Sequence, residues 1–448
     1  MAFPTHAFPA GLPLCPPRDA VLGYLRAYAA DLRDMITFDE RVVAVSHPPP
    51  SSAAPATAEH GKVGKWTVWL ESGASQQYDA VVVANGHYNI PHIPDYPGLR
   101  AAASCWPASP LPPGHRQKGG ERKGEGEGEG EGVGEGEGEG KGEGEGEGGG
   151  EGEGEGGMDV GDGRRVRRRC TIEHARNFRS PAAYAGKRVL VVGNHVSGTE
   201  IVQQLLPYAS LPLLQSARSK GAFPAWPAEK VVVLPAIERF LAEPGHLRFV
   251  DGSELPGSVD VVLFATGFLY SFPFLPRAPD GSREGEVGGE RATGTWQHLF
   301  NASDPTLAYI GLPTRVIPFG LAQSQAAVVA RVWSGRVQLP PPDEMRAWEQ
   351  TRLEAVNYRL RNFHILGFPL DADYMDFLES LADGGAEGRG RGGGIEPARW
   401  RGKERWMRSL VPQIRQRVIA ALERGEVVTT LEQVGLVYDG KQEINGVS

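Results

Sequence analysis

An unbroken apolar run, Val189 to Val192, leads directly into a turn with a glycine at each end, Gly193 and Gly198. Such a run is typical of a strand that is buried on both faces, as in a parallel sheet. The amphipathic segment from Glu200 to Leu206 comes after the turn and predicts a helix. Because parallel strands need crossover connections, this strand, turn and helix restrict the chain to an α/β architecture.

The same turn has the features of a dinucleotide-binding site. Its first glycine lets the chain leave the strand sharply, its last lets the helix pack closely on the strand, and the helix N-terminus presents amides to a pyrophosphate. His195 stands where the usual pattern has its middle glycine, so an ordinary strand-to-helix turn of another α/β protein is the alternative. The residues predicted to bind the cofactor here are Gly193, Asn194, His195, Val196, Ser197 and Gly198.

An arginine, Arg218, stands twenty residues after Gly198, where an NAD-binding protein would place an acid against the ribose hydroxyls. A guanidinium at this position suits a 2′-phosphate, which it can hold through charge-assisted hydrogen bonds. The sequence therefore favours NADPH over NADH, with Arg218 as a cofactor-binding residue. Single surface arginines are common, and a chance occurrence is the alternative interpretation.

Two further apolar runs end in a glycine turn. Val81 to Val83 leads into Asn85-Gly86, and Val261 to Ala265 leads into Thr266-Gly267. Small residues after a buried strand let the backbone pass close to a bound dinucleotide, or let one domain hinge on another. We predict that Asn85, Gly86, Thr266 and Gly267 bind cofactor, with a plain strand end as the alternative.

The remaining regular structure is predicted from periodicity. Helical spacing of apolar residues begins at Arg18, and short strands are predicted at 42–45, 66–70 and 80–84. The C-terminal part is predicted to be mostly helical, over residues 322–334, 343–361 and 404–423.

From Gly124 to Gly157 the sequence is almost pure alternation of glycine and glutamate. Glycine is the costliest residue to order, like charges repel, and the tract has almost nothing apolar to bury. We therefore predict a disordered low-complexity insertion over residues 109–169. The stretch from Glu121 to Gly163 carries a charge of −13, so the other 405 residues carry about +5 of the net −8. The overall acidity thus says nothing about the partners of the folded part.

Several function classes find no support in the sequence. The basic cluster at 164–169 is short and lacks interleaved aromatic residues, which argues against nucleic-acid binding. No apolar run reaches the roughly 18 residues of a membrane span, and no secretory signal begins the chain. Three scattered cysteines form no metal or redox motif and indicate a reducing, cytoplasmic location: Cys15, Cys105 and Cys170.

No catalytic residue can be assigned from the sequence. Neither a Ser-His-Asp arrangement nor a metal-binding set of residues is present. Three histidines in apolar or aromatic surroundings, His87, His174 and His364, are expected to be structural hydrogen-bonding residues rather than catalytic bases.

Taken in order, these segments resemble the flavin-containing monooxygenases, especially their plant-type S-oxygenating branch. Residues 85–98 resemble that family's linker out of its FAD domain, and His174 with Phe178 resembles the latter half of its fingerprint. Residues 265–275 resemble a later signature, and so do residues 310–319 together with Gln325 and Arg331. The resemblance implies that Gln325 is a cofactor-site residue, and it covers nearly the whole chain outside 109–169 and 384–396.

The resemblance implies an α/β fold with two dinucleotide-binding Rossmann-like domains, in which the NADPH domain is inserted in the FAD domain. The expected divisions are a first FAD-domain part at 1–108, the insertion at 109–169, an NADPH domain at 170–262, and a second FAD-domain part with C-terminal helices at 263–448. It also implies an FAD- and NADPH-dependent enzyme that uses O₂ to oxygenate a small molecule at a soft sulfur or nitrogen atom.

The family also begins with a strand, a complete GxGxxG turn and a helix that hold FAD. Residues Phe3 to Pro9 resemble a segment that lies C-terminal to that region in the family. The resemblance therefore implies that the first FAD-binding segment is missing and that the chain binds FAD poorly. The alternative is a non-catalytic NADPH-binding relative or a truncated gene product. A pyridine-nucleotide disulfide oxidoreductase would need a closely spaced cysteine pair, which this sequence lacks.

Overall fold

The fold is given by a computed structural model of the chain. It describes residues 2–47, 65–102, 170–219, 226–276, 289–384 and 394–440, with residues 101 and 102 described by their backbone alone. Residues 1–107 and 169–448 belong to one compact unit. The predicted insertion at 109–169 lies outside the described residues.

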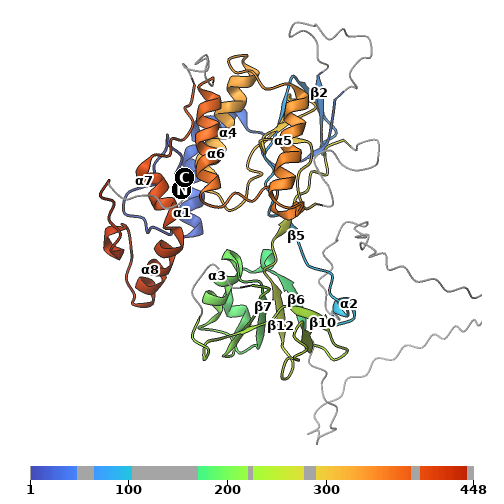
Figure 1. Cartoon of the computed structure of the whole chain (residues 1–448), viewed down its shortest axis with the longest axis vertical. Helices are drawn as coiled ribbons and strands as arrows, with labels where there is room; N and C mark the ends of the chain where they lie inside the picture. The colour runs from blue at the N-terminus through green and yellow to red at the C-terminus, as the bar shows by residue number, and fades with distance from the viewer. Residues whose placement is uncertain are drawn as a thin grey trace, which may run out of the picture. The chain divides into compact units, whose positions relative to one another are not determined.

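A parallel sheet of five strands carries the predicted dinucleotide-binding turn (Figure 1). Its order is β6 (Thr171–His174), β12 (Val261–Phe264), β7 (Val189–Val192), β8 (Leu213–Ser216) and β9 (Val231–Leu234). Every residue of β7, β8 and β12 is buried, as expected of strands covered on both faces. The chain runs from β7 outward to β8 and β9 and returns to the other side of β7 as β12. The order therefore reverses between β7 and β12, which is where open α/β sheets bind their ligands.

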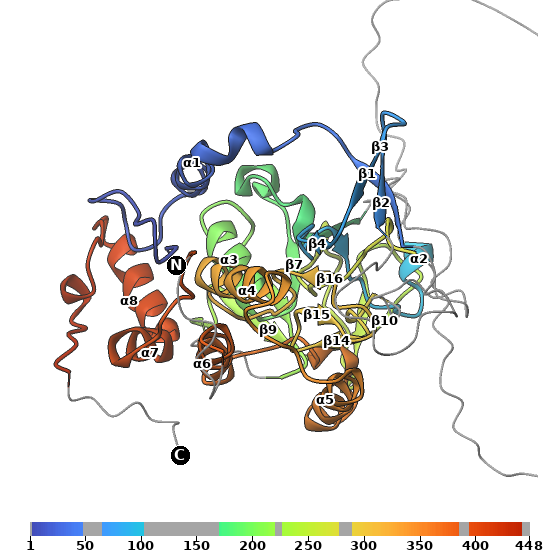
Figure 2. The ribbon, with the colours of Figure 1, turned by 90° about the horizontal axis from the view of Figure 1, so that it is seen from above.

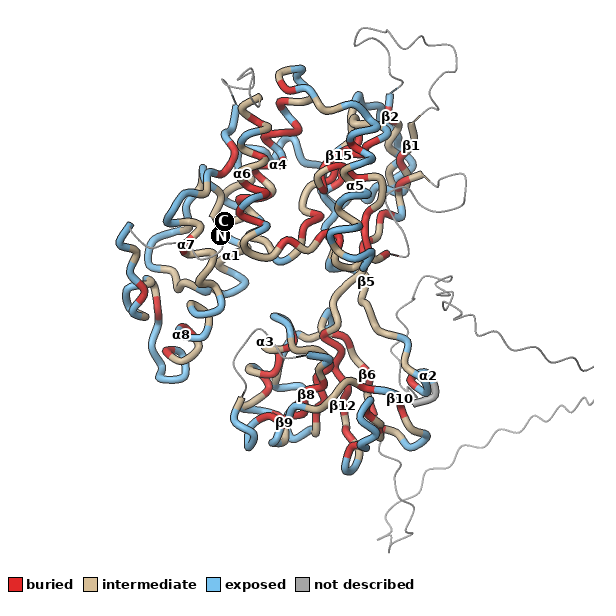
Figure 3. Tube along the Cα trace, viewed as in Figure 1, coloured by how far each residue is buried: buried red, intermediate tan, exposed pale blue. Residues whose placement is uncertain are grey.

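Alternate side chains of the central strand enter two separate cores. Val189 and Val191 pack with helix α3 (Val196–Leu205), while Leu190 and Val192 pack with the ribbon of β10 (Ile237–Phe240) and β11 (Leu247–Phe249). Figure 3 shows buried residues concentrated along this sheet. The unbroken apolar run of β7 is thus explained by cover on both of its faces.

A second sheet joins segments from before and after the parallel one. Strands β14 (Thr295–Trp296), β15 (Phe300–Asn301), β16 (Leu307–Tyr309) and β4 (Val81–Val83) form it in that order, with β4 parallel to β16. A two-stranded ribbon of β5 (Ile90–Pro91) and β13 (Phe268–Leu269) connects the halves. A domain inserted in another domain, as predicted, is confirmed by this topology.

A third sheet consists of β1 (Val42–Ser46), β2 (Trp66–Leu70) and β3 (Ser75–Tyr78), all antiparallel. Its strands β1 and β2 lie where the sequence predicts strands at 42–45 and 66–70. Val45 and Trp66 are buried with residues of the second sheet.

Two helices begin at or near the residues where the sequence predicts them. Helix α1 (Arg18–Tyr28) begins at the predicted residue, and α4 (Pro318–Trp333) begins four residues earlier than predicted because Pro318 suits the first helical position. Helix α6 (Leu370–Ala382), which was not predicted, lies beside α4 (Figure 2).

Two long predicted helices are interrupted. The helix predicted over 343–361 is α5 (Pro342–Ala355), and it ends before Asn357 and Tyr358, whose φ values of 51° and 54° are incompatible with a helix. The helix predicted over 404–423 is two helices, α7 (Gly402–Ser409) and α8 (Val411–Glu423). Pro412 stands at the break, where it lacks the N–H that a continuous helix would need.

Two predicted domain limits cut through the packing of the parallel sheet. The limit between residues 262 and 263 falls inside β12, which pairs along its whole length with β6 and β7. Ile93, Tyr96 and Leu99, predicted in the FAD domain, pack in the same core as β7, and α2 (Leu99–Ala102) starts there. The core around the parallel sheet therefore includes residues from 93–99 as well as residues from 170–264.

Candidate functional site

The glycine turn after β7 is built as its sequence predicts. Gly193 has a φ of 116°, and a Cβ placed on it would lie 2.6 Å from the Ala265 carbonyl oxygen. A Cβ on Gly198 would lie 2.2 Å from the Gly193 carbonyl oxygen. Only glycine fits at either position, because helix α3 packs so closely on the strand that a Cβ would collide with a backbone oxygen.

The first turn of α3 is open to a ligand. His195 is its N-cap residue but makes no side-chain cap hydrogen bond, and no acidic residue stands in the first turn. His195, Val196 and Ser197, at the start of α3, are exposed to solvent. Burial and the positive charges of Arg315 and Arg218 lower the pKa of His195. Uncapped helix amides beside two arginines form a positive environment that suits an anion.

Asn194 ties the glycine turn to the loop that carries Arg218. Its Nδ2 donates to the Ser219 carbonyl oxygen at 2.6 Å, and the Gly193 N–H donates to the Ser216 carbonyl oxygen at 2.9 Å. Arg218 is exposed, and its guanidinium makes no hydrogen bond or ion pair with the described residues. The structure thus brings Arg218 to the carboxyl edge of the sheet beside the predicted turn.

The end of β12 completes this edge. The Thr266 hydroxyl donates to the His92 carbonyl oxygen at 2.5 Å, and the His92 N–H donates to the Gly267 carbonyl oxygen at 2.9 Å. His174, at the end of β6, donates from Nε2 to the same Gly267 oxygen at 3.0 Å. Thr266 and Gly267 therefore adjoin the glycine turn, where hydrogen bonds to His92 and His174 hold them.

The remaining predicted residues belong to the other half. Asn85 lies just after β4 and donates from Nδ2 to the Ser271 carbonyl oxygen at 3.0 Å, and Gly86 has a φ of 71°. Gln325 is buried on α4, where its Oε1 accepts from the Gly311 N–H at 2.9 Å and its Nε2 bonds the Tyr374 hydroxyl at 3.2 Å. In this chain the Gln325 amide therefore has protein partners on both sides.

Sequence reasoning missed two residues of the site, His92 and Arg361. Arg361 donates from Nη1 to His92 Nδ1 at 2.5 Å and from Nη2 to the Thr266 carbonyl oxygen at 3.1 Å. Burial, and next the Arg361 charge, lower the pKa of His92 to about 4, so its ring is neutral and accepts. The Pro91-His92 linker offered a local signal for His92, but no local pattern marks Arg361.

Of the three histidines expected to be structural, two have both ring nitrogens bonded. His174 Nδ1 accepts from the Arg176 N–H at 3.0 Å, and burial lowers its pKa to about 4. His364 accepts from the Ala292 N–H at 3.1 Å and bonds His298 through the two Nδ1 atoms at 2.9 Å. His87 differs, because its buried Nε2 has no partner among the described residues.

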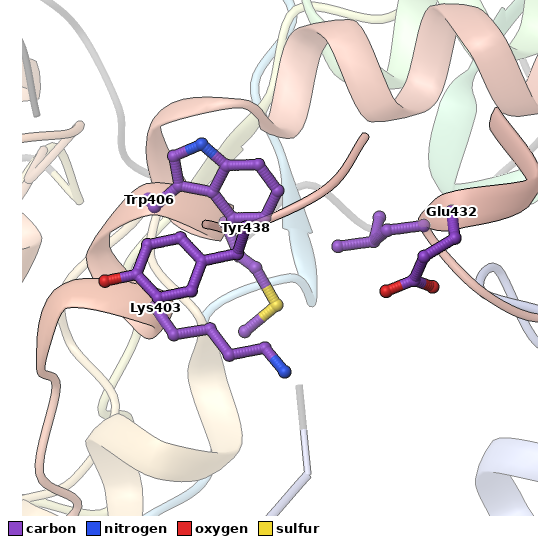
Figure 4. Close-up of a pocket in the computed structure, with 6 residues that line it drawn as sticks. Lys403, Trp406, Glu432 and Tyr438 are labelled. Atoms are coloured by element: carbon purple, nitrogen blue, oxygen red, sulfur yellow. The ribbon is translucent and has the colours of Figure 1, made fainter. Parts of the chain in front are cut away.

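A cleft of about 250 Å³ lies elsewhere, between α7 and the C-terminal segment (Figure 4). The rings of Trp406 and Tyr438 form one wall with centroids 5.3 Å apart, and Lys403 and Glu432 stand at its rim. None of its lining residues belongs to the predicted cofactor site, and nothing in its chemistry selects a ligand.

Comparisons with known proteins show which proteins the chain is similar to. Residues 228–385 match the model of a family described as flavin-binding monooxygenase-like. Over 375 residues the chain is 26% identical to flavin-containing monooxygenase FMO GS-OX-like 2 of Arabidopsis thaliana, a match that covers 81% of this chain and 63% of that protein. The chain is therefore similar to proteins of the flavin-binding monooxygenase-like family.

Other proteins with related names are similar to the chain as well. The chain is 25% identical over 338 residues to trimethylamine monooxygenase of Methylocella silvestris, a match that covers 75% of this chain and 57% of that protein. The structure of S-allyl-L-cysteine S-oxygenase from Allium sativum aligns with a TM-score of 0.62 at 21% identity, over 97% of this chain and 80% of that one. The predicted resemblance to flavin-containing monooxygenases of the plant type is confirmed. The predicted α/β fold with two dinucleotide-binding domains is confirmed as well.

The chain spans less than two thirds of the length of both sequence relatives. Among its described residues, no helix is both long enough and apolar enough to cross a bilayer. Of the cysteines, Cys15 is exposed and Cys170 is buried, both as free thiols, while Cys105 lies outside the described residues.

Proposed function

We propose that this chain acts as a flavin-dependent monooxygenase that uses NADPH and O₂ to oxygenate a soft sulfur or nitrogen atom of a small molecule. The observation that carries the proposal is the anion-binding edge of the parallel sheet. There the glycine turn and the open first turn of α3 meet Arg218, which is unpaired among the described residues. The class of reaction is inferred from the resemblance to the family, and the choice of nucleotide is inferred from the residues of the site.

The residues at this edge fit NADPH. The pyrophosphate would lie against the amides of the first turn of α3, because Gly193 and Gly198 keep side chains away from it. Arg218 would hold the 2′-phosphate through charge-assisted hydrogen bonds. Asn194 would then act by holding the loop of Arg218 against the turn.

FAD would lie at the carboxyl ends of β4 and β16, where Asn85, Gly86 and the Gly311–Gln325 pair are found. When bound, the flavin accepts a hydride from NADPH and activates O₂. The chain's own part is to hold both cofactors and exclude water, which is consistent with a site that shows no acid–base pair among its described residues. The ribbon of β5 and β13 connects the two cofactor sites.

Sulfur and nitrogen substrates are both consistent with the relatives, which include an S-oxygenase and a trimethylamine monooxygenase by name. The alternative function is a non-catalytic NADPH-binding relative. It is favoured by one observation: among the described residues, β7 and α3 form the sole strand, glycine turn and helix of the dinucleotide-binding type. A cytoplasmic location stays a prediction from the cysteine pattern.

The first experiment tests the choice of nucleotide. Replacing Arg218 with Ala should weaken NADPH binding by about ten- to a hundredfold, since a bond to a charged group contributes about 1.5–3 kcal/mol, and should leave NADH nearly unaffected. Titration of both proteins with both nucleotides measures this without catalysis. Arg239→Ala, an exposed arginine of β10, is the matched control. Equal losses for the two nucleotides would show that Arg218 does not contact the 2′-phosphate.

The second experiment separates the enzyme from the binding module. The chain is mixed with FAD and NADPH, and O₂ uptake is followed with a thioether and with a tertiary amine. FAD is supplied in large excess, because weak FAD binding is predicted, and substrate-dependent uptake that yields a sulfoxide or an N-oxide is then expected. NADPH binding without any oxygenated product would favour the non-catalytic alternative.

A further inference from the structure

Arg361 lies over the end of strand β12 although it comes from the C-terminal part of the chain. It stands in a short 3₁₀ helix, Leu360–Asn362, and its guanidinium bonds His92 Nδ1 and the Thr266 carbonyl oxygen. A Cβ on Gly267 would lie 3.4 Å from Arg361 Nη2, so the guanidinium covers the turn itself.

Among the described residues, no counter-charge is in contact with Arg361. The side chain is half-buried, and no carboxylate of the described part of the chain lies within ion-pair distance of it. Glu290 acts on it from farther away, and Arg218 adds a like charge; burial is the main cause that lowers its pKa. A half-buried cation without a partner is costly, so the site favours an anion.

Three other arginines with little exposed side chain have the carboxylate partner that Arg361 lacks, whereas the partly buried Arg352 bonds carbonyl oxygens. Arg291 pairs with Glu349, Arg331 with Glu396, and Arg408 with Asp371. Arg361 has instead one carbonyl oxygen and one neutral histidine nitrogen, neither of which neutralises its charge.

The sheet order indicates which anion this position would serve. Strand β12 is the neighbour of β7, and Ala265, which precedes Thr266, already contacts the glycine turn closely enough to exclude a Cβ on Gly193. Arg361 therefore stands at the point where the strand order reverses, which is where the pyrophosphate of a dinucleotide lies. Arg218 stands on the other side, after β8.

We propose that Arg361 is a second cofactor-binding arginine, whose guanidinium neutralises the dinucleotide pyrophosphate while Arg218 binds the 2′-phosphate. This inference rests on the proposed NADPH site. It predicts a division of labour, because the pyrophosphate is common to NADPH and NADH whereas the 2′-phosphate is present in NADPH alone.

The test uses Arg361→Gln, which keeps a polar side chain with N–H donors but removes the charge. NADPH and NADH affinities should both fall by a similar factor, about ten- to a hundredfold. Arg359→Gln, an exposed arginine two residues away, should change both by less than about twofold, and circular dichroism and melting temperature confirm that the variants fold. Arg361→Lys keeps the charge and should retain more affinity than Arg361→Gln.

A loss for NADPH alone would overturn the assignment to the pyrophosphate, and so would unchanged affinities in Arg361→Gln. If the unaltered chain binds neither nucleotide, the proposed NADPH function fails, and inorganic pyrophosphate then decides the inference. A rise in melting temperature with pyrophosphate that Arg361→Gln abolishes would support the role of Arg361. No rise, or an equal rise in both proteins, would overturn it.

Discussion

Two helical glycines of this chain, Gly198 and Gly23, differ in how much space a side chain would have. Gly198, in α3, has no room for a Cβ because the Gly193 carbonyl oxygen would lie 2.2 Å away. Gly23, in α1, has nothing within 4 Å of the place where a Cβ would stand. At Gly198 the side chain is excluded by packing, whereas Gly23 carries the entropic penalty of glycine in a helix without any such need.

Replacing Gly198 with Ala should therefore destabilise the chain by about 1–3 kcal/mol, because the helix must move away from the strand. It should also weaken NADPH binding, since the same movement displaces the amides of the first turn of α3. The matched variant Gly23→Ala should be neutral or stabilise by about 0.5–1 kcal/mol. Thermal unfolding and nucleotide titration measure both effects, and equal behaviour of the two variants would contradict the packing argument.

Among the elements, helix α4 is fastened to a stretch that has no regular structure. Arg331, only 2% exposed, donates to the Ile395 carbonyl oxygen at 3.1 Å and to Glu396 Oε1 at 3.1 Å. Ser324 Oγ accepts from the Ala398 N–H at 2.8 Å. These bonds hold residues 395–398 along α4 and explain why a helix so apolar carries buried polar residues.

Arg331→Met should destabilise the chain by about 3 kcal/mol, since it breaks a buried ion pair and leaves the Ile395 carbonyl oxygen without this donor. Glu396 is half-exposed, so water can solvate its carboxylate once Arg331 is gone. The expected loss of stability is therefore near the lower end of the range for broken buried ion pairs. Arg346→Ala on α5 removes an exposed ion pair with Asp343 and should cost less than about 1 kcal/mol. Similar losses in denaturant unfolding of the two variants would refute this account of α4.

For the whole molecule, the buried histidines dominate the expected response to acid. Burial lowers the pKa of His92 and His174 to about 4 and of His298 to about 3, and it lowers that of His364 well below its usual value. In the unfolded chain these rings would titrate near pH 6.5. Below that pH the unfolded state binds protons that the folded state rejects, so stability is complete above about pH 6.5 and falls as the pH decreases toward 4.

Each such histidine contributes up to about 1.4 kcal/mol per pH unit to the slope of the free energy of unfolding against pH, so the four together contribute up to about 5.6 kcal/mol per pH unit. The melting temperature should therefore be steady from pH 8 to 7 and fall steeply between pH 6 and 5. Carboxylates with lowered pKa, such as Glu379, act only below about pH 4.5 and do not affect this window. A melting temperature that stays constant down to pH 5 would show that the histidines do not govern acid stability.

The sequence by itself determined the features that depend on neighbouring residues. Four apolar residues and then two glycines five positions apart predicted β7, the turn and α3, because strand burial and glycine sterics act over a few residues. The resemblance of motifs added the inserted domain, which the pairing of β4 with β16 bears out. It also added the likeness to flavin-binding monooxygenases, which the comparisons bear out.

Only the tertiary structure decided what stands around that turn. His92 and Arg361 are 269 residues apart in the chain, and no local periodicity could indicate that they meet at Thr266. The sequence pattern likewise did not predict the helix breaks near residues 357 and 410. Nor did it predict that Leu99 and the whole of β12 pack with the parallel sheet. These features depend on non-local packing and on the electrostatics of buried groups, which arise only when distant segments share one core.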